Sequence, residues 1–231
     1  MRIKFILVEP KVPENIGAAA RAIKTMGFSE LYLVNPCEYK SGKARWLAHG
    51  SHDVIDRALT FETLAKAVEK MDIVIGTTAR RRITKSEYID IRDLNDLLTE
   101  QAGHNNTISI VFGREESGLS NEELALCDIT SSISMAATYP SLNLSHAVML
   151  YAYELGQLAL KQHKQREAAG TQSLSLLKAK VDELLSGTNV GKNRALKGRI
   201  MERLVMLPGK DINLVHSIAN ALAEKNKINK Q

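Results

Sequence analysis

The chain of 231 residues contains few cysteines and no long apolar run. Its two cysteines, Cys37 and Cys127, match neither a disulfide framework nor a metal-ligand spacing, so we expect a reduced, cytoplasmic setting. No apolar stretch approaches the roughly 20 residues of a membrane span, and the opening MRIKFILVEP meets Glu9 too soon for a signal peptide. We therefore expect no membrane partner and predict that the opening segment is the first strand.

The chain also lacks the common catalytic fingerprints. It has neither G-x-x-x-x-G-K-[ST] nor G-x-G-x-x-G, which excludes a P-loop and a dinucleotide-binding fingerprint. No Cys/His cluster has the spacing for zinc and no serine stands in a nucleophile elbow, so we expect no metal and no serine-histidine-aspartate chemistry. Six tyrosines, four phenylalanines and one tryptophan make a poor base-stacking platform, which favours recognition of a nucleic acid by shape and phosphate charge.

Charge is divided unequally along the chain. Residues 1–160 hold 17 Lys and Arg against 20 Asp and Glu, a net charge of −3, whereas residues 161–231 hold 14 against 6, a net charge of +8. The two values add up to the +5 of the whole chain. A basic appendage on a near-neutral body favours a polyanion partner such as RNA or DNA, although a solvated helical face would look the same.

Strand-like and helix-like patterns alternate over the first 160 residues. Apolar runs predict strands at 3–8, 31–34, 73–75, 108–112 and 129–135. Helical spacing predicts helices at 14–26, 60–70, 90–101, from Ser120 onward and from Leu144 past Leu160, whereas residues 35–58 give no clear order. This period predicts an α/β fold with a mostly parallel sheet flanked by helices.

A second unit is predicted at the carboxyl end of the chain. Residues 164–172 are the best linker candidate, which gives domains at 1–163 and 173–231. Amphipathic patterns at 174–185, 196–207 and 212–222 predict a small all-helical basic domain, whose lysines and arginines point outward and suit RNA binding.

Polar residues collect where the predicted strands end. Asn15, Glu115 and Asn143 follow three different strands, and the carboxyl edge of a parallel sheet is where such proteins bind ligands. Each asparagine alone is more typical of a turn or a helix cap. Trp46 and His146 could also face such a site, but we expect packed or capping roles for both.

Three of these segments together resemble a known family. Residues 15–21 (NIGAAAR), 112–119 (FGREESGL) and 139–145 (YPSLNLS), with GTTAR at 76–80 between them, resemble the motifs of SPOUT-class (trefoil-knot) RNA 2′-O-ribose methyltransferases. The similarity is closest to the TrmH/TrmJ-like branch, which includes LasT-like tRNA/rRNA methyltransferases. It covers roughly residues 1–160, and the basic helical tail resembles the carboxyl-terminal extension of that branch.

The resemblance implies a fold, a cofactor and a partner. Residues 73–160 would form a deep trefoil knot that binds S-adenosylmethionine and releases S-adenosylhomocysteine, and family members act as homodimers. The substrate would be RNA, tRNA or rRNA, because only RNA offers a 2′-hydroxyl. The implied cofactor-binding residues are Thr77, Thr78, Ala79, Gly113, Ile133, Met135 and Leu142.

The resemblance also implies catalytic residues. Arg21 would lie at the reacting hydroxyl, with Asn15 orienting it, Glu115 organising the substrate loop, and Ser141 and Asn143 completing the pocket. A guanidinium has a pKa of about 12.5 to 13.8, so we favour phosphate binding and alkoxide stabilisation by Arg21 over a role as general base.

The run of arginines after the third predicted strand is a separate candidate. Arg80, Arg81 and Arg82 are expected to contact RNA phosphates, although a solvated loop would have the same sequence.

Two alternatives to an RNA ribose methyltransferase remain open at this point. One is an inactive RNA-binding module that kept the fold, against which the intact motif residues argue. The other is an unrelated nucleotide-binding regulator with a basic tail. The departure Tyr139-Pro140 before Ser141 leaves the choice between tRNA and rRNA, and the target nucleotide, undecided.

Overall fold

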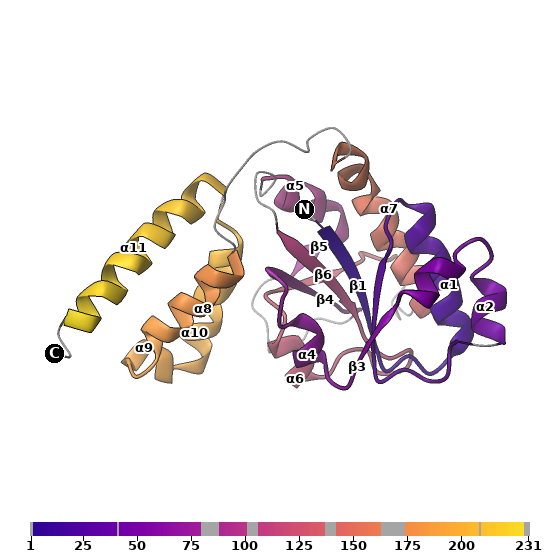
Figure 1. The fold of residues 1–231 in the computed structure, drawn as a ribbon, viewed down its shortest axis with the longest axis horizontal. Coiled ribbons are helices and arrows are strands. Elements are labelled where there is room, and N and C mark those ends of the chain that lie inside the picture. The colour runs from indigo at the N-terminus through magenta and orange to yellow at the C-terminus, as the bar shows by residue number, and fades with distance from the viewer. Residues whose placement is uncertain are drawn as a thin grey trace.

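The computed structural model describes residues 2–40, 42–79, 88–100, 106–136, 142–162, 174–207 and 209–228. In this part of the chain a parallel sheet has the strand order β3-β2-β1-β6-β4-β7-β5 (Figure 1). The strands are β1 (Arg2–Val8), β2 (Glu30–Val34), β3 (Leu59–Phe61), β4 (Ile73–Thr77), β5 (Ile89–Asp90), β6 (Thr107–Phe112) and β7 (Ile129–Ser132). The predicted α/β class is confirmed, and every strand pair is parallel.

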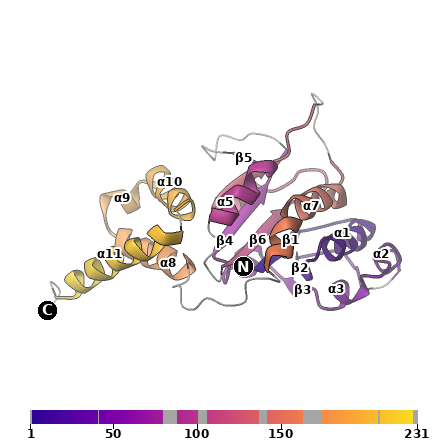
Figure 2. The same ribbon diagram turned by 90° about the horizontal axis from the view of Figure 1, so that it is seen from above.

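Helices cover both faces of this sheet. Those of the first unit are α1 (Pro13–Thr25), α2 (Lys43–Leu47), α3 (His52–Asp56), α4 (Leu64–Val68), the 3-10 turn η1 (Ile91–Asp93), α5 (Leu94–Glu100), α6 (Asn121–Ala125) and α7 (Leu144–Gln162). Side chains of α1, α3, α5 and α7 share one core with one sheet face, and those of α4 and α6 share a second core with the other face. Figures 1 and 2 show the resulting three layers.

The alternation of side chains along β1 explains why this strand is apolar throughout. Phe5 and Leu7 are fully buried in the first core, whereas Ile6 and Val8 are buried in the second. A strand buried on both faces needs apolar residues at successive positions, which is the pattern that the sequence predicts.

Two short edge strands correct the predicted elements. The predicted start of the helix at 60–70 is wrong, because residues Leu59–Phe61 form strand β3 and pair with β2. Helix α4 begins only after Thr63, whose hydroxyl accepts a hydrogen bond from the backbone N–H of Lys66. The helix expected at 90–101 likewise begins late, because Ile89–Asp90 pairs with β7 as β5. The strand expected at 129–135 ends at Ser132.

Within the described residues, four helices form a second unit beside the sheet (Figures 1 and 2). They are α8 (Leu174–Leu185), α9 (Asn189–Lys192), α10 (Arg194–Val205) and α11 (Gly209–Ile228). The predicted helices 174–185, 196–207 and 212–222 correspond to α8, α10 and α11, whereas α9 was not predicted. The predicted linker 164–172 lies outside the described residues.

The amino end of α8 contacts the sheet at the edge where the strands begin. Leu174 and Leu177 are fully buried in the first core. The Lys178 ammonium lies 2.6 Å from the carboxylate of Asp128, which precedes β7, and the Ser175 N–H donates to Asp72, which precedes β4, at 3.0 Å. The helical unit is therefore attached at the amino edge of the sheet, opposite the edge at which the strands end.

No helix within the described residues is both long enough and apolar enough to cross a membrane.

Candidate functional site

A cavity of about 480 Å³ lies at the carboxyl ends of β4, β6 and β7. The βα alternation brings these three strand ends together, although β6 and β7 follow β4 far along the chain. All seven residues expected to bind a cofactor lie in its wall, namely Thr77, Thr78, Ala79, Gly113, Ile133, Met135 and Leu142. The volume falls in the range of about 300–1,000 Å³ that small-molecule sites occupy.

The wall formed by the turn after β6 is tight. A Cβ on Gly113 would come within 2.0 Å of the carbonyl carbon of Gly118, so only glycine fits there. The backbone N–H of Arg114 donates to the carbonyl of Gly118 at 3.2 Å, and the N–H of Gly118 donates back at 3.0 Å. Gly118 has a φ of +68°, which residues with a Cβ rarely adopt. These contacts give the turn a fixed shape against the cavity.

Three residues from three separate segments form a hydrogen-bonded chain beside the cavity. The Nδ2 of Asn15 donates to Glu115 at 3.0 Å, and the Nδ2 of Asn143 donates to the Oδ1 of Asn15 at 2.8 Å. The Oδ1 of Asn143 in turn accepts from the backbone N–H of Ser145 at 2.8 Å, at the start of α7. The structure thus brings together three of the five expected catalytic residues.

The Glu115 carboxylate also binds the segment before α1. It accepts from the backbone N–H groups of Lys11 and Val12, each at 3.2 Å. Burial by itself would raise the pKa of this carboxyl, but the hydrogen bonds from Asn15 and from backbone N–H groups outweigh it and lower the pKa below its usual value. Glu115 is therefore held as a carboxylate at neutral pH.

Two aromatic residues in the wall were missed by the sequence analysis. Tyr151 and Phe112 line the cavity, with ring centroids 5.4 Å apart in an edge-to-face arrangement. The Tyr151 hydroxyl donates to the Oγ of Ser131 at 2.9 Å, and burial raises the pKa of Tyr151. Helical spacing could have indicated Tyr151, because this residue falls two turns after Leu144 on the same side of α7, and Leu144 also lines the cavity.

Arg21 does not lie in the wall of the cavity. It is exposed on α1, six residues after Asn15, which turns it about 240° around the helix axis. Among the described residues none forms an ion pair or hydrogen bond with its guanidinium. Arg21 is therefore not part of the hydrogen-bonded chain of Asn15, Glu115 and Asn143.

The remaining expected site residues lie outside the described part of the chain. These residues are Ser141, Arg80, Arg81 and Arg82. The described residues contain no group of three or more His, Cys, Asp or Glu side chains that could hold a metal ion.

Of the packed or capping roles expected for Trp46 and His146, the packed role is wrong for both residues. Trp46 is 83% exposed, and His146 is exposed as well. Helix α2 buries only Ala44, two residues before Trp46, so the indole lies on nearly the opposite side of that helix.

Comparison with protein families gives two matches. Residues 2–153 match the model of the SpoU rRNA Methylase family, and residues 171–226 match the model described as tRNA/rRNA methyltransferase LasT, C-terminal domain. The two matches fall on the sheet unit and on the helical unit.

Curated relatives match over nearly the whole chain. A protein of Escherichia coli (strain K12), named uncharacterized tRNA/rRNA methyltransferase LasT, is 42% identical over 98% of this chain and 99% of its own length. A protein of Shigella dysenteriae serotype 1, named tRNA (cytidine/uridine-2′-O-)-methyltransferase TrmJ, is 32% identical over 99% of this chain and 98% of its own.

Solved structures share the fold. The crystal structure of TrmJ from Z. mobilis ZM4 has a TM-score of 0.68 at 25% identity and covers 96% of this chain and 100% of its own. The SpoU methyltransferase AviRb from Streptomyces viridochromogenes, solved in complex with the cofactor AdoMet, has a TM-score of 0.57 at 21% identity over 69% of this chain and 61% of its own.

Proposed function

The chain belongs to the SpoU rRNA methylase family, and from this premise we propose that it transfers a methyl group from S-adenosylmethionine to a ribose 2′-hydroxyl of tRNA. The family and its relatives favour this activity over an inactive RNA-binding module. The choice of tRNA rests on the activity for which the Shigella dysenteriae relative is named.

One observation carries the proposal. Asn15, Glu115 and Asn143 come from the three sequence motifs and are joined by hydrogen bonds of 3.0 and 2.8 Å beside one cavity. Partners so far apart along the chain meet only if the fold places the motifs together. A cavity with small residues and backbone groups at strand ends on one side and apolar side chains on the other fits an adenosine-containing cofactor.

We assign roles to these residues on that basis. The bound cofactor supplies a methyl group on a sulfonium centre. Thr77, Thr78 and Ala79 would form one side of its binding site, Gly113 a second, and Ile133, Met135 and Leu142 the apolar side. The Glu115 carboxylate would hold the loop that faces the substrate, while Asn15 and Asn143, with Ser141, would shape the place where the ribose enters.

Arg21 would act on the RNA rather than on the cofactor. Its guanidinium is exposed and would bind the phosphate next to the target ribose and stabilise the charge that develops on the 2′-oxygen. The proton of the hydroxyl would pass to phosphate or water, because a guanidinium with a pKa above about 12 is a poor base.

We further propose a homodimer in the cytoplasm. Met149, Leu150 and Tyr153 expose apolar surface on the outer side of α7, and α7 packs beside α1, which carries Arg21. Exposed apolar residues at helical spacing suit a contact with a second copy.

The RNA is expected to bind two basic parts of the chain. The basic helical unit and the run Arg80, Arg81 and Arg82 would contact RNA phosphates. Residues 73–160 would form the trefoil knot of the SPOUT class.

Methyl transfer is tested with S-adenosylmethionine that carries a trideuterated methyl group. The protein is incubated separately with tRNA and rRNA from cells that lack the gene, and the nucleosides are analysed by mass spectrometry. We expect labelled 2′-O-methylnucleosides from tRNA. Arg21→Ala should lower this rate by about 100-fold or more, as loss of a charge-stabilising donor does. Calorimetry should show that this variant still binds S-adenosylhomocysteine, because Arg21 is outside the cavity wall.

Lys24→Ala is the matched control, since Lys24 is an exposed cation on the same helix that pairs with Asp53 at 2.6 Å. Label on a base instead of a ribose, or label in rRNA alone, would overturn the proposed reaction or substrate. Full activity of Arg21→Ala would overturn the role given to that residue. Absence of any transfer by the unaltered protein would favour the inactive module.

A further inference from the structure

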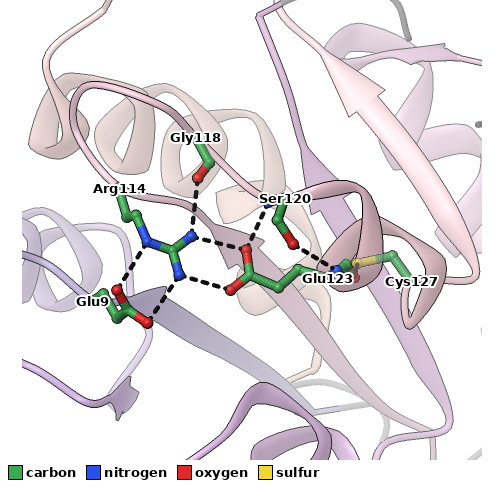
Figure 3. Close-up of polar contacts among 6 residues, drawn as sticks. All are labelled: Glu9, Arg114, Gly118, Ser120, Glu123 and Cys127. Atoms are coloured by element: carbon green, nitrogen blue, oxygen red, sulfur yellow. Dashed lines mark hydrogen bonds and ion pairs between the residues drawn. The ribbon is translucent and has the colours of Figure 1, made fainter. Parts of the chain in front are cut away.

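Arg114 lies in the cavity wall, directly before Glu115, and an arginine at such a place in an RNA-modifying enzyme would ordinarily be taken for a phosphate contact. The surroundings of Arg114 differ from those of an arginine that is available to bind a phosphate. The guanidinium lies between two carboxylates, those of Glu9 and Glu123, as Figure 3 shows. Glu9 directly follows β1, and Glu123 belongs to α6, so this one side chain joins two elements to the turn after β6.

Four N–H groups of the guanidinium donate hydrogen bonds, and the fifth belongs to Nη2, which also lies at ion-pair distance from a carboxylate. Its Nε donates to Glu9 at 2.9 Å, and its Nη2 lies 2.9 Å from the other oxygen of Glu9. Its Nη1 and Nη2 donate to the two oxygens of Glu123, both at 3.0 Å, and Nη1 also reaches the carbonyl of Gly118 at 3.4 Å. A guanidinium has five donors and no more, so none is left for a phosphate or for a cofactor carboxylate.

The two acceptors are themselves fixed in place. Glu123 also accepts from the backbone N–H of Ser120 at 2.7 Å, and the Ser120 hydroxyl accepts from the Glu123 N–H at 3.2 Å, which forms a capping box at the start of α6. Glu9 has a left-handed φ of +46°, which is uncommon for a residue with a Cβ. The hydrogen bond from Arg114 lowers the pKa of Glu9, so the carboxylate stays charged at neutral pH.

The next residue binds the same segment from another side. Glu115 accepts from the N–H groups of Lys11 and Val12 and from Asn15, whereas Arg114 holds Glu9. Consecutive residues of one turn therefore attach to residues 9–15 at two places. Two carboxylates around one guanidinium also leave this spot with a net negative charge, which repels a phosphate.

We propose that Arg114 is a positioning residue, which locks the turn at 113–118 between β1 and α6 and so presents the Glu115 carboxylate to Asn15 and the substrate. The proposal rests on the proposed methyl transfer for its kinetic consequence. Its structural part, the order of the turn, does not depend on that activity.

The test compares Arg114→Ala and Arg114→Lys with the unaltered protein. Lysine keeps the charge but has three donors and no planar fork, so it cannot serve both carboxylates and Gly118. We expect faster amide hydrogen exchange at residues 113–119 in both variants. The informative amides are those of residues 114 and 118, which in the unaltered protein donate to each other's carbonyl groups. The kcat for methyl transfer should fall by about 100-fold with an unchanged KM for RNA, because the reacting groups are misplaced while RNA contacts remain.

Chemical rescue separates positioning from a general loss of structure. Guanidinium ion, at a concentration that leaves the unaltered protein unaffected, should restore part of the kcat of Arg114→Ala but not of Arg114→Lys, whose side chain fills the space. Arg45→Ala is the matched control, because Arg45 also pairs with a carboxylate, that of Asp56, but on α2, none of whose residues line the cavity. This control should change neither the exchange at 113–119 nor kcat.

Three results would overturn the proposal. A raised KM for RNA with kcat retained would make Arg114 a direct RNA contact. Unchanged hydrogen exchange at residues 113–119 in both variants, or full activity of both, would show that the turn does not need the guanidinium of Arg114. If the unaltered protein transfers no methyl group, the proposed function fails, and the exchange data alone then decide for or against the locking of the turn. If Arg114→Ala does not fold, the lysine variant decides.

Discussion

Glu115 shows how the environment of one residue determines its charge. Its carboxylate is half-buried, yet it receives hydrogen bonds from Asn15 and from the N–H groups of Lys11 and Val12. These donors stabilise the charged form more than burial disfavours it, and the pKa is lowered. A side chain that the sequence marks only as polar is in this way kept ionised next to the cavity.

This pKa shift predicts a pH-dependent contribution to stability. A carboxyl whose folded-state pKa lies below its unfolded value stabilises the fold above the unfolded pKa and loses this effect as pH falls through the folded pKa. Glu115→Gln should therefore lower the free energy of unfolding by about 1 kcal/mol at pH 7, a discounted value for hydrogen bonds to a half-exposed charge. The difference from the unaltered protein should shrink when urea unfolding is repeated near pH 4 and below.

Glu116→Gln is the control for loss of charge alone, because Glu116 is the exposed neighbour of Glu115. A stability difference for Glu115→Gln that stays constant from pH 7 to acid pH would contradict the prediction, since it would show that the amide substitution acts through packing.

At the scale of elements, α1 and α7 lie side by side and serve the site in different ways. Helix α1 supplies Asn15 to the hydrogen-bonded chain and exposes Arg21 on another side. Helix α7 places Tyr151 and Leu144 in the cavity wall and exposes Met149, Leu150 and Tyr153. A helix with one apolar side in the core and further apolar residues outside is typical of an interface.

The exposed side of α7 gives a prediction about assembly. The unaltered protein should sediment as a dimer at micromolar concentration, and Tyr153→Glu should shift it toward the monomer by placing a charge in the apolar contact. Tyr153 is 64% exposed in the single chain, so the substitution should not unfold it.

Leu176→Glu serves as the control, because Leu176 is 62% exposed on α8 and is not part of the proposed contact. It should leave the sedimentation coefficient unchanged. A monomeric unaltered protein, or a Tyr153 variant that remains fully dimeric, would rule out this face as the contact.

At the scale of the whole molecule, the sheet unit and the helical unit meet at the edge opposite the cavity. Lys178 on α8 is bound to Asp128, whose side chain is only 8% exposed and which also accepts from the backbone N–H of Val74 at 2.8 Å. Leu174 and Leu177 are buried beside this pair. The basic part of the chain, residues 161–231 with a net charge of +8, is thus attached through α8 to residues 1–160, which have a net charge of −3, by a partly buried ion pair.

The ion pair predicts the strength of this attachment. Lys178→Met keeps most of the apolar stem but leaves the Asp128 carboxylate without its counter-charge. The free energy of unfolding should fall by about 1–3 kcal/mol, the cost of leaving a buried polar group without its partner. Chemical denaturation followed by circular dichroism measures this loss.

Lys197→Met is the matched control, because Lys197 pairs with Asp182 within the helical unit, at a site where both side chains are more exposed than that of Asp128. An exposed pair contributes at most about 1 kcal/mol, so its loss should cost less. Equal losses for the two variants would mean that the Lys178 pair does not fasten the units together.

Local patterns in the sequence were sufficient for the βα alternation and for the helices α1, α7, α8, α10 and α11, whereas the family resemblance implied seven of the residues that line the cavity. Burial on two faces makes strands such as β1 apolar throughout, and helical packing repeats every three to four residues, so both are visible in short windows. The motifs at 15–21, 112–119 and 139–145 likewise marked the strand ends that meet.

Other features were decided only by the tertiary structure. The edge strands β3 and β5 exist because β2 and β7 offer free backbone groups to them, which no local pattern records. Asn15 binds Glu115, 100 residues away, and Asn143 binds Asn15 across 128 residues. The Arg114 guanidinium binds Glu9, which follows β1, and Glu123 of α6. Hydrogen bonds between distant segments depend on how the chain packs in three dimensions, so the residue types alone did not distinguish an arginine that binds RNA from one that holds a turn in place.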